Sequence, residues 1–282
     1  MSAFGRRTFL VGTLGAGLAL AGCTKGAAPL VTPTASPAGT VREQLDAVMA
    51  VYAQNTDLLG LSLRDRRSGA TYAFRGDYST QSASIAKVMI VLLALRKARA
   101  EGTELTFDQY TWASKAIINS DNDSADALWE WVGGKDAYTA LAADLGLAHT
   151  RGDERSEFWS WTNTTPDDQR ALVDALVDGS PALAVDDRLY LLDLMGKTNA
   201  EQTWGVGHDR GGDVRVQMKN GWVQFASLDN LWAVNTIGHV SGEGRDYTAA
   251  IMCRRPTFAD GRVLVDAIGA DLFTLLGSGT LS

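Results

Sequence analysis

Three short motifs in the chain contain the residue types of a nucleophilic active site. They are Ser84-Ile85-Ala86-Lys87, Ser120-Asp121-Asn122 and Lys219-Asn220-Gly221. A serine followed three residues later by a lysine arises by chance about once in a chain of this length and average composition. Each of the three patterns occurs once here, however, and in the order expected if they form one site. Their conjunction therefore predicts a serine nucleophile.

The spacing within the first motif has a chemical reason. Three residues apart on a helix, Ser84 and Lys87 lie on the same face, which brings the amine close to the hydroxyl. A serine hydroxyl is a weak nucleophile until a base takes its proton, and Lys87 can be that base if burial and cationic neighbours keep its amine partly neutral. At a helix start, Ser84 also offers its backbone N–H to a developing oxyanion. The alternative is a serine cap followed by a lysine whose stem packs on the surface; the presence of all three motifs favours catalysis.

These motifs resemble those of the penicillin-recognising serine hydrolases, the superfamily of class A β-lactamases and cell-wall D,D-peptidases. The resemblance extends over nearly all of residues 41–282 and includes the Asp-x-x-x-Gly turn at Asp65–Gly69. It implies that the substrate acylates Ser84, that Lys87 is the activating base, and that Ser120 relays the proton to the leaving nitrogen.

The same resemblance implies roles for residues that would hold the substrate. Asn122 orients the substrate amide, and Lys219 supplies a positive charge for a substrate carboxylate. Asn220 stands where a threonine or serine hydroxyl usually binds that carboxylate, and an amide can still donate a hydrogen bond there in a shifted geometry. Gly221 allows its strand to approach the ligand closely, and Trp222 matches the position of the second oxyanion N–H.

One departure from the family pattern bears directly on turnover. Class A β-lactamases carry a Glu-x-x-x-Asn loop that holds the deacylating water, and no such match follows Leu145, because Glu154 and Glu157 are mis-spaced. Without a positioned water, an acyl-enzyme should hydrolyse slowly. The same stretch, Arg155–Trp161, carries the aromatic residues Phe158, Trp159 and Trp161, which are expected to pack the loop, with the lining of a groove as the alternative.

A second departure concerns size. The two motif serines, Ser84 and Ser120, are 36 positions apart, fewer than in typical class A enzymes. This spacing predicts a trimmed helical subdomain and a more open cleft. Together with the missing loop and Asn220, it predicts a relative of β-lactamases that does not destroy antibiotics efficiently.

The first forty residues have the composition of an export signal and a tether. Arg6-Arg7 and the apolar run Val11–Ala21 are typical of a twin-arginine signal, and the run is too short to span a bilayer. It ends at Cys23 in a sequence that resembles a bacterial lipobox, which predicts a signal peptide over 1–22 and lipidation of Cys23; the alternative is a plain secretory signal with an incidental cysteine. Residues 23–40 are rich in Pro, Ala, Thr and Ser, which predicts a disordered tether before a folded domain over 41–282.

Apolar periodicity predicts the elements that position the motifs. A capping box at Thr40–Glu43 opens a first helix, and Leu58–Phe74 is predicted to be a β-hairpin. Val88–Leu95 is apolar on all sides, which favours a buried central helix. Residues 105–195 have helical spacing with no strand pattern.

Strand patterns return at Val214–Met218, Leu231–Ile237 and Tyr247–Met252, before a last helix that Asp260 is expected to cap. Strands at both ends of the chain, with helices between them, imply one sheet assembled from distant segments. We therefore expect an α/β (α+β) fold of the β-lactamase/transpeptidase type, in which terminal helices flank a central antiparallel sheet and a reduced all-helical subdomain is added.

Composition disfavours several other classes of function. The formal net charge of −7 leaves no basic stripe to bind nucleic acid. The two cysteines are too few for a disulfide framework or a four-thiolate zinc site, and the three histidines lack metal-ligand spacing, so neither a metal nor another cofactor is expected. Cys253 is expected to be a buried small hydrophobic residue.

These observations predict an exported, lipid-anchored serine hydrolase of the β-lactamase-like class that forms an acyl-enzyme at Ser84. Its substrate would be a small molecule or peptide of β-lactam or peptidoglycan type, and it would meet the membrane through its lipid anchor. Two alternatives stay open: a D,D-peptidase or esterase with little β-lactamase turnover, and a non-catalytic lipoprotein that binds envelope components.

Overall fold

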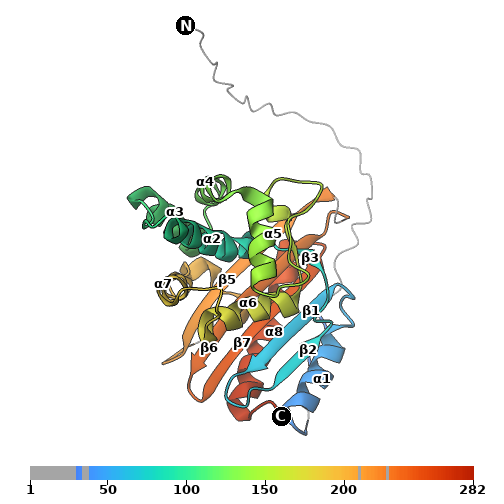
Figure 1. Ribbon diagram of the computed structural model, residues 1–282. Coiled ribbons are helices and arrows are strands. Elements are labelled where there is room, and N and C mark those ends of the chain that lie inside the picture. The colour runs from blue at the N-terminus through green and yellow to red at the C-terminus, as the bar shows by residue number, and fades with distance from the viewer. Residues whose placement is uncertain (1–29, 34–37, 209–210, 227–228) are drawn as a thin grey trace, which may run out of the picture.

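The computed structural model describes residues 30–33, 38–208, 211–226 and 229–282 (Figure 1). The predicted signal peptide, the lipidation site Cys23 and residues 24–29 and 34–37 of the predicted tether lie outside these ranges. In the part of the chain that is described, no helix is both long enough and apolar enough to cross a membrane.

One described piece of the predicted tether contacts the folded domain. The side-chain amide of Asn55 accepts a hydrogen bond from the backbone N–H of Val31 (2.8 Å) and donates one to its carbonyl oxygen (3.0 Å). Leu30 packs against the core next to this contact. The composition of residues 23–40 gave no indication of it, because the partner amide lies in a distant part of the sequence.

The core of the fold is a five-stranded antiparallel sheet with strand order β2-β1-β7-β6-β5. Because β1 pairs with β7, the first and last strands of the described chain are neighbours in the sheet, as the sequence predicts. The strands are β1 (Leu59–Asp65), β2 (Thr71–Phe74), β5 (Arg215–Gln224), β6 (Trp232–Gly242) and β7 (Arg245–Arg255).

The predicted hairpin of β1 and β2 is confirmed, and its turn is tied to the C-terminus. The carbonyl oxygen of Asp65 accepts from the N–H of Gly69 (2.8 Å), whose φ of 76° is readily adopted only by glycine. The buried carboxylate of Asp65 accepts from Arg67 and from the backbone N–H of Leu281 (2.9 Å). The last residues of the chain are thereby fastened to the first hairpin.

Eight α-helices of the described chain surround the sheet. Helix α1 has the predicted capping box between Thr40 and Glu43. The expectation that Asp260 caps the last helix is wrong: the hydroxyl of Thr257 is the cap and accepts from the Asp260 N–H (3.0 Å). The helices are α1 (Val41–Tyr52), α2 (Ala86–Ala100), α3 (Phe107–Ile118), α4 (Asn122–Val132), α5 (Gly134–Asp144), α6 (Pro166–Asp178), α7 (Val185–Met195) and α8 (Phe258–Ser278).

The helices form two layers and a subdomain. Helices α1 and α8 cover one face of the sheet, and α6 lies across the other face (Figure 1). Helices α2 to α5 and α7 form the subdomain beyond α6. Alternate residues serve the two faces: Leu61 and Leu63 join the core with α1 and α8, whereas the Ser62 hydroxyl bonds to Asp167 of α6 (2.6 Å). The predicted α/β fold with a helical subdomain is confirmed.

Helix α2 is the axis of that subdomain. Every side chain from Ala86 to Leu92 is buried, as the all-round apolar pattern predicts. The expectation of no strand between 105 and 195 is wrong in one place, since β4 (Asn163–Thr164) pairs with β3 (Thr80–Gln81). Two residues are too few to leave a strand periodicity in the sequence.

Candidate active site

Ser84 lies on a 3₁₀ turn, η1 (Ala83–Ile85), which continues directly into α2. Ala83 has a φ of 50°, in the left-handed region that costs a non-glycine residue roughly 1 kcal/mol or more. The half-buried side chain of Ser84 borders a pocket, and its hydroxyl makes no hydrogen bond with any residue that the structure describes. Backbone strain of this kind concentrates at functional sites.

Lys87 is fully buried one turn further along α2. Its Nζ donates to the carbonyl oxygen of Ser120 (2.6 Å) and to Oδ1 of Asn122 (2.8 Å), with a longer contact to Ser120 Oγ (3.4 Å). Burial lowers the pKa of Lys87 to about 7, against the attraction of Asp121 and Asp126 for the charged form. A neutral amine can satisfy both short contacts with its two N–H groups and keep its lone pair for a proton.

Ser120 occupies the loop between α3 and α4. Its φ of 58° is the second left-handed non-glycine backbone at the pocket. The next residue, Asp121, caps α4 by accepting from the N–H of Ser124 (2.8 Å), which fixes the loop. Ser120 therefore presents its carbonyl oxygen to Lys87 while its hydroxyl lies between two lysines.

The second of these lysines is Lys219, which reaches Ser120 from β5. Its buried Nζ donates to Ser120 Oγ (2.9 Å) and to the carbonyl oxygen of Asn220 (3.0 Å). No carboxylate of the described residues pairs with either lysine. Burial and the like charge of Lys87 lower the pKa of Lys219 well below its ordinary value. Two ammonium groups sharing this dry site are disfavoured, so a neutral amine is available to act as a base.

Strand β5 passes directly against the turn that carries Ser84. A Cβ built on Gly221 would lie 2.7 Å from the backbone nitrogen of Ser84 and 2.8 Å from that of Ile85, so only glycine fits without movement. The next residue, Trp222, lines the pocket.

The side-chain amide of Asn220 does not line the pocket. Its Nδ2 donates to the carbonyl oxygens of Gln202 (2.8 Å) and Trp204 (3.1 Å), and its side chain is completely buried. The sequence expectation for Asn220 was a hydrogen bond to a substrate carboxylate. In the structure this amide instead fastens β5 to the segment that precedes it.

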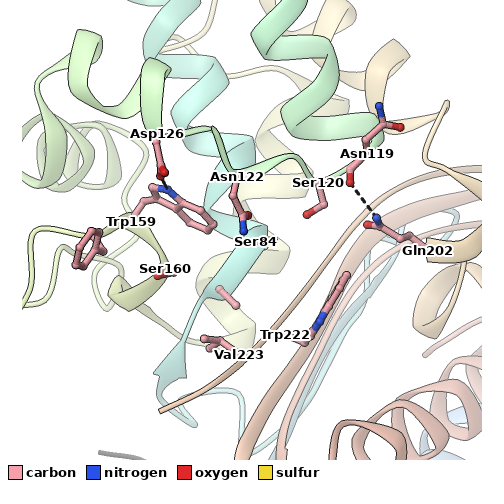
Figure 2. Close-up of a pocket in the computed structure, with 12 residues that line it drawn as sticks. Ser84, Asn119, Ser120, Asn122, Asp126, Trp159, Ser160, Gln202, Trp222 and Val223 are labelled. Atoms are coloured by element: carbon pink, nitrogen blue, oxygen red, sulfur yellow. Dashed lines mark hydrogen bonds between the residues drawn. The ribbon is translucent and has the colours of Figure 1, made fainter. Parts of the chain in front are cut away.

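Four of the predicted residues border a cavity of about 410 Å³ (Figure 2). Ser84, Ser120, Asn122 and Trp222 line it, and the two lysines lie behind Ser120 and Asn122. The remaining lining residues come from η1, the end of α3, α4, the loop after α5, the 3₁₀ turn η3 (Ala200–Gln202) and β5: Ala83, Asn119, Asp126, Phe158, Trp159, Ser160, Gln202 and Val223.

Comparison with known sequences decides the family. The sequence model described as "Beta-lactamase enzyme family" matches residues 107–276, which is more than half of the chain. The chain belongs to this family. The matched range contains Ser120 and Lys219 and begins after Ser84.

This beta-lactamase family member is also similar to a curated mycobacterial protein and to solved structures. "Putative lipoprotein LppW" of Mycobacterium tuberculosis is 26% identical over 244 residues, covering 80% of this chain and 74% of the relative. A class A beta-lactamase from Bacteroides cellulosilyticus superposes with a TM-score of 0.71 at 18% identity, over 86% of this chain and 100% of that one. PBP-A superposes equally well, with a TM-score of 0.71 at 20% identity, over 88% of this chain and 99% of that one. The two solved structures share the fold.

The pocket of this family member also has an acidic residue that sequence reasoning missed. Asp126 lies four residues after Asn122 on α4, and this helical spacing could have identified it. For Trp159 the sequence left two alternatives open, packing of its loop and lining of a groove; its ring lines the pocket and its Nε1 donates to Asp126 Oδ1 (2.6 Å; Figure 2). No local pattern marks Trp159, because its partners are distant in sequence.

Neither a metal site nor a reactive thiol is found in the described part of this family member. Across the described ranges, no group of three or more His, Cys, Asp or Glu side chains is arranged to hold a metal ion. Cys253 is buried in the sheet, and burial raises the pKa of its thiol to about 12. The prediction that Cys253 is a buried hydrophobic residue is confirmed.

Proposed function

We propose that this protein is a serine hydrolase that is acylated at Ser84 by β-lactams or by cell-wall peptides. One observation supports this most strongly: two buried lysine amines converge on the hydroxyl of Ser120, next to a pocket that Ser84 borders. Buried amines without carboxylate partners are costly to a fold. Proton transfer accounts for their position beside the pocket that Ser84 borders, where the Ser84 hydroxyl makes no hydrogen bond with a described residue.

In the proposed acylation, Lys87 takes the proton of the Ser84 hydroxyl as Oγ attacks the substrate carbonyl carbon. The backbone N–H groups of Ser84 and Trp222 would stabilise the oxyanion. As the C–N bond breaks, the hydroxyl of Ser120 gives its proton to the leaving nitrogen and receives the one held by Lys87. The products are an ester on Ser84, a neutral Lys87 and a free amine.

Asn122 and Lys219 would hold the substrate. Oδ1 of Asn122 accepts from Lys87, which leaves its Nδ2 directed into the pocket, where it can donate to a substrate carbonyl (Figure 2). A substrate carboxylate close to Ser120 would favour the protonated form of Lys219. Asn220 would contribute indirectly, because its amide is committed to Gln202 and Trp204.

The scarcity of carboxylates around the pocket favours a second candidate. This is a peptidase-like protein with little turnover of β-lactams. Among the described residues that line it, Asp126 is the one acidic side chain, and it accepts a hydrogen bond from Trp159. Glu154 and Glu157 lie outside the pocket lining, and Glu157 pairs with Lys135. Deacylation by water would therefore have only Asp126 as a carboxylate base in the described lining, and its Oδ1 already accepts from Trp159.

We also propose that the mature protein is anchored to the outer face of the cell membrane by lipid on Cys23. The lipobox-like sequence supports this, and so does the name of the relative LppW, which is described as a lipoprotein. Several acyl chains on one cysteine hold a protein far more firmly than one chain does.

Intact-mass spectrometry tests the proposal. The chain, expressed without residues 1–22 and with Cys23→Ser, is incubated with benzylpenicillin, and hydrolysis of a chromogenic cephalosporin is followed in parallel. A lasting adduct on Ser84 with little hydrolysis would establish the peptidase-like candidate, and rapid hydrolysis without an adduct would establish a β-lactamase.

Two serine variants make the assignment specific. Ser84→Ala should abolish the adduct and the hydrolysis, whereas Ser160→Ala, at another serine of the pocket lining, should retain them. Adduct formation or turnover by Ser84→Ala would remove Ser84 from the mechanism. Absence of both signals in the wild-type protein would contradict acylation by β-lactams.

A further inference from the structure

A line of contacts leads from helix α4 to the amine of Lys87 through Trp159. Trp159 belongs to the 3₁₀ turn η2 (Trp159–Trp161), and its indole Nε1 donates to Asp126 Oδ1 at 2.6 Å. Nζ of Lys87 lies over its ring, 4.6 Å from the ring centroid. Although it borders the pocket, Trp159 is only 6% exposed, so the ring separates the amine from solvent on that side.

We propose that Trp159 is a positioning residue, held by Asp126, which shields the amine of Lys87 from water and so keeps it in the neutral form that can accept a proton from Ser84. The inference rests on the proposed function, in which Lys87 is the base. It adds a residue to the machinery that the three sequence motifs do not contain.

The groups around Lys87 show why shielding decides its protonation. The amine faces the carbonyl oxygen and hydroxyl of Ser120 and the amide of Asn122, and its charged neighbours are Asp121, Asp126 and Lys219. The two carboxylates favour the ammonium form and Lys219 opposes it. Neither carboxylate forms an ion pair with Lys87, so attraction does not offset the loss of hydration.

An indole face also attracts a cation, and the two effects of Trp159 on Lys87 must be weighed. A cation–π contact offsets only part of the free energy that an ion loses when it is removed from water. Shielding therefore outweighs attraction, and the ring favours the neutral amine.

Asp126 acts on Lys87 in two ways that can be separated. Its hydrogen bond to the indole holds the ring in place, and its negative charge favours the ammonium form. Asp126→Asn keeps an oxygen that can accept from Nε1 and removes the charge. Trp159→Ala removes the shield and keeps the charge. The two substitutions should therefore move the titration of Lys87 in opposite directions.

The pH profile of Ser84 acylation is the first test. The rate of adduct formation with benzylpenicillin, measured by mass spectrometry between pH 5.5 and 9.5, should rise with pH as Lys87 loses its proton. We expect Trp159→Ala to move the midpoint up by about one unit or more, which is a tenfold loss of rate on the rising limb, and Asp126→Asn to move it down. Trp159→Phe, which keeps a ring without the N–H, should lie between Trp159→Ala and the wild type.

Trp161→Ala is the matched control. Trp161 lies in the same turn but stacks on Phe225 (ring centroids 4.2 Å apart) and does not contact Lys87. Its substitution should leave the midpoint unchanged. If Trp159→Ala has the wild-type midpoint, or if Trp161→Ala shifts it equally, Trp159 has no specific effect on Lys87 and the inference is overturned.

A direct titration separates failure of this inference from failure of the proposed function. The lysine side chains, labelled with ¹³C at Cε, are titrated by NMR, and the Lys87 resonance is assigned with Lys87→Met. If no β-lactam acylates Ser84, the proposed function fails, yet the Lys87 midpoint still tests the shielding. An unchanged Lys87 midpoint in both Trp159→Ala and Trp159→Phe would overturn the inference. Should Trp159→Ala fail to fold, Trp159→Phe and Asp126→Asn carry the test.

Discussion

Gly221 lies so close to Ser84 that a Cβ on the glycine would stand 2.7 Å from the serine's backbone nitrogen. The contact joins β5 to the turn η1, two segments more than a hundred residues apart in sequence. It places the N–H of Ser84 next to the strand that carries Lys219 and Trp222. The position of the proposed oxyanion site therefore depends on the absence of one methyl group.

Gly221→Ala should separate these two segments. The added Cβ meets backbone atoms that have no alternative rotamer, so β5 or η1 must move. Because misplacement by about 1 Å can cost 10²-fold in rate, we expect acylation of Ser84 to fall by about that factor. Gly211→Ala is the control, since its Cβ would meet nothing within 4 Å. Wild-type acylation by Gly221→Ala would show that the approach of β5 is not needed.

Ser120→Ala should slow acylation without changing its site. The hydroxyl of Ser120 is the proposed proton relay and contacts both Lys87 and Lys219. We expect the rate of adduct formation to fall by about 10²–10⁴, while peptide mapping still places the adduct on Ser84. Loss of a hydrogen bond should lower the free energy of unfolding by only about 1 kcal/mol. An adduct formed at the wild-type rate would exclude the relay.

The stability of the protein should increase as pH rises above neutrality. Burial lowers the pKa of Lys87 to about 7 and that of Lys219 well below 10.5. Between the folded values and 10.5, the unfolded chain binds more protons than the folded protein, so the free energy of unfolding rises with pH. Chemical denaturation at pH 7, 8 and 9 measures this slope.

A lysine substitution tests the origin of that slope. Lys219→Met should reduce it, because one of the two buried amines is gone, whereas Lys197→Met, at a lysine with a 59% exposed side chain, should leave it unchanged. An equal slope in wild type and Lys219→Met would mean that Lys219 titrates alike in the folded and unfolded chain.

Asn220→Ala should reduce stability more than it affects substrate contacts. The amide of Asn220 is buried and supplies donors to the carbonyl oxygens of Gln202 and Trp204. Leaving these oxygens without donors should cost about 1–3 kcal/mol in the free energy of unfolding. Asn119→Ala, at an exposed side chain of the pocket rim, should change it by less than about 0.5 kcal/mol. Unchanged stability with lost penicillin binding would instead support the substrate role expected from the sequence.

Much of the fold was predictable because its causes are local. The capping box at Thr40, the hairpin turn at Gly69 and the apolar helix after Ser84 each follow from neighbouring residues, and the structure has all three. Where a local choice had two answers, prediction failed: Thr257 and Asp260 can both cap a helix, and the structure uses Thr257. The strand β4 escaped prediction because two residues show no period.

By itself, the sequence determined which chemical groups are available for the proposed acyl transfer. It supplies a serine and a lysine one helical turn apart, a second serine with an amide, and a lysine before a glycine, and these types indicate amine-assisted acyl transfer whatever the detailed geometry. It also indicated that no loop carboxylate has the spacing to hold a deacylating water.

Only the tertiary structure decided how those groups are partnered. It directs the amine of Lys87 to Ser120 and Asn122, turns the amide of Asn220 away from the pocket, and places the ring of Trp159 against Lys87. Each of these contacts joins residues that are distant in sequence and depends on how their side chains pack in the folded protein. Local patterns encode helices, strands and caps, whereas burial and the protonation state of an amine depend on everything that packs around it.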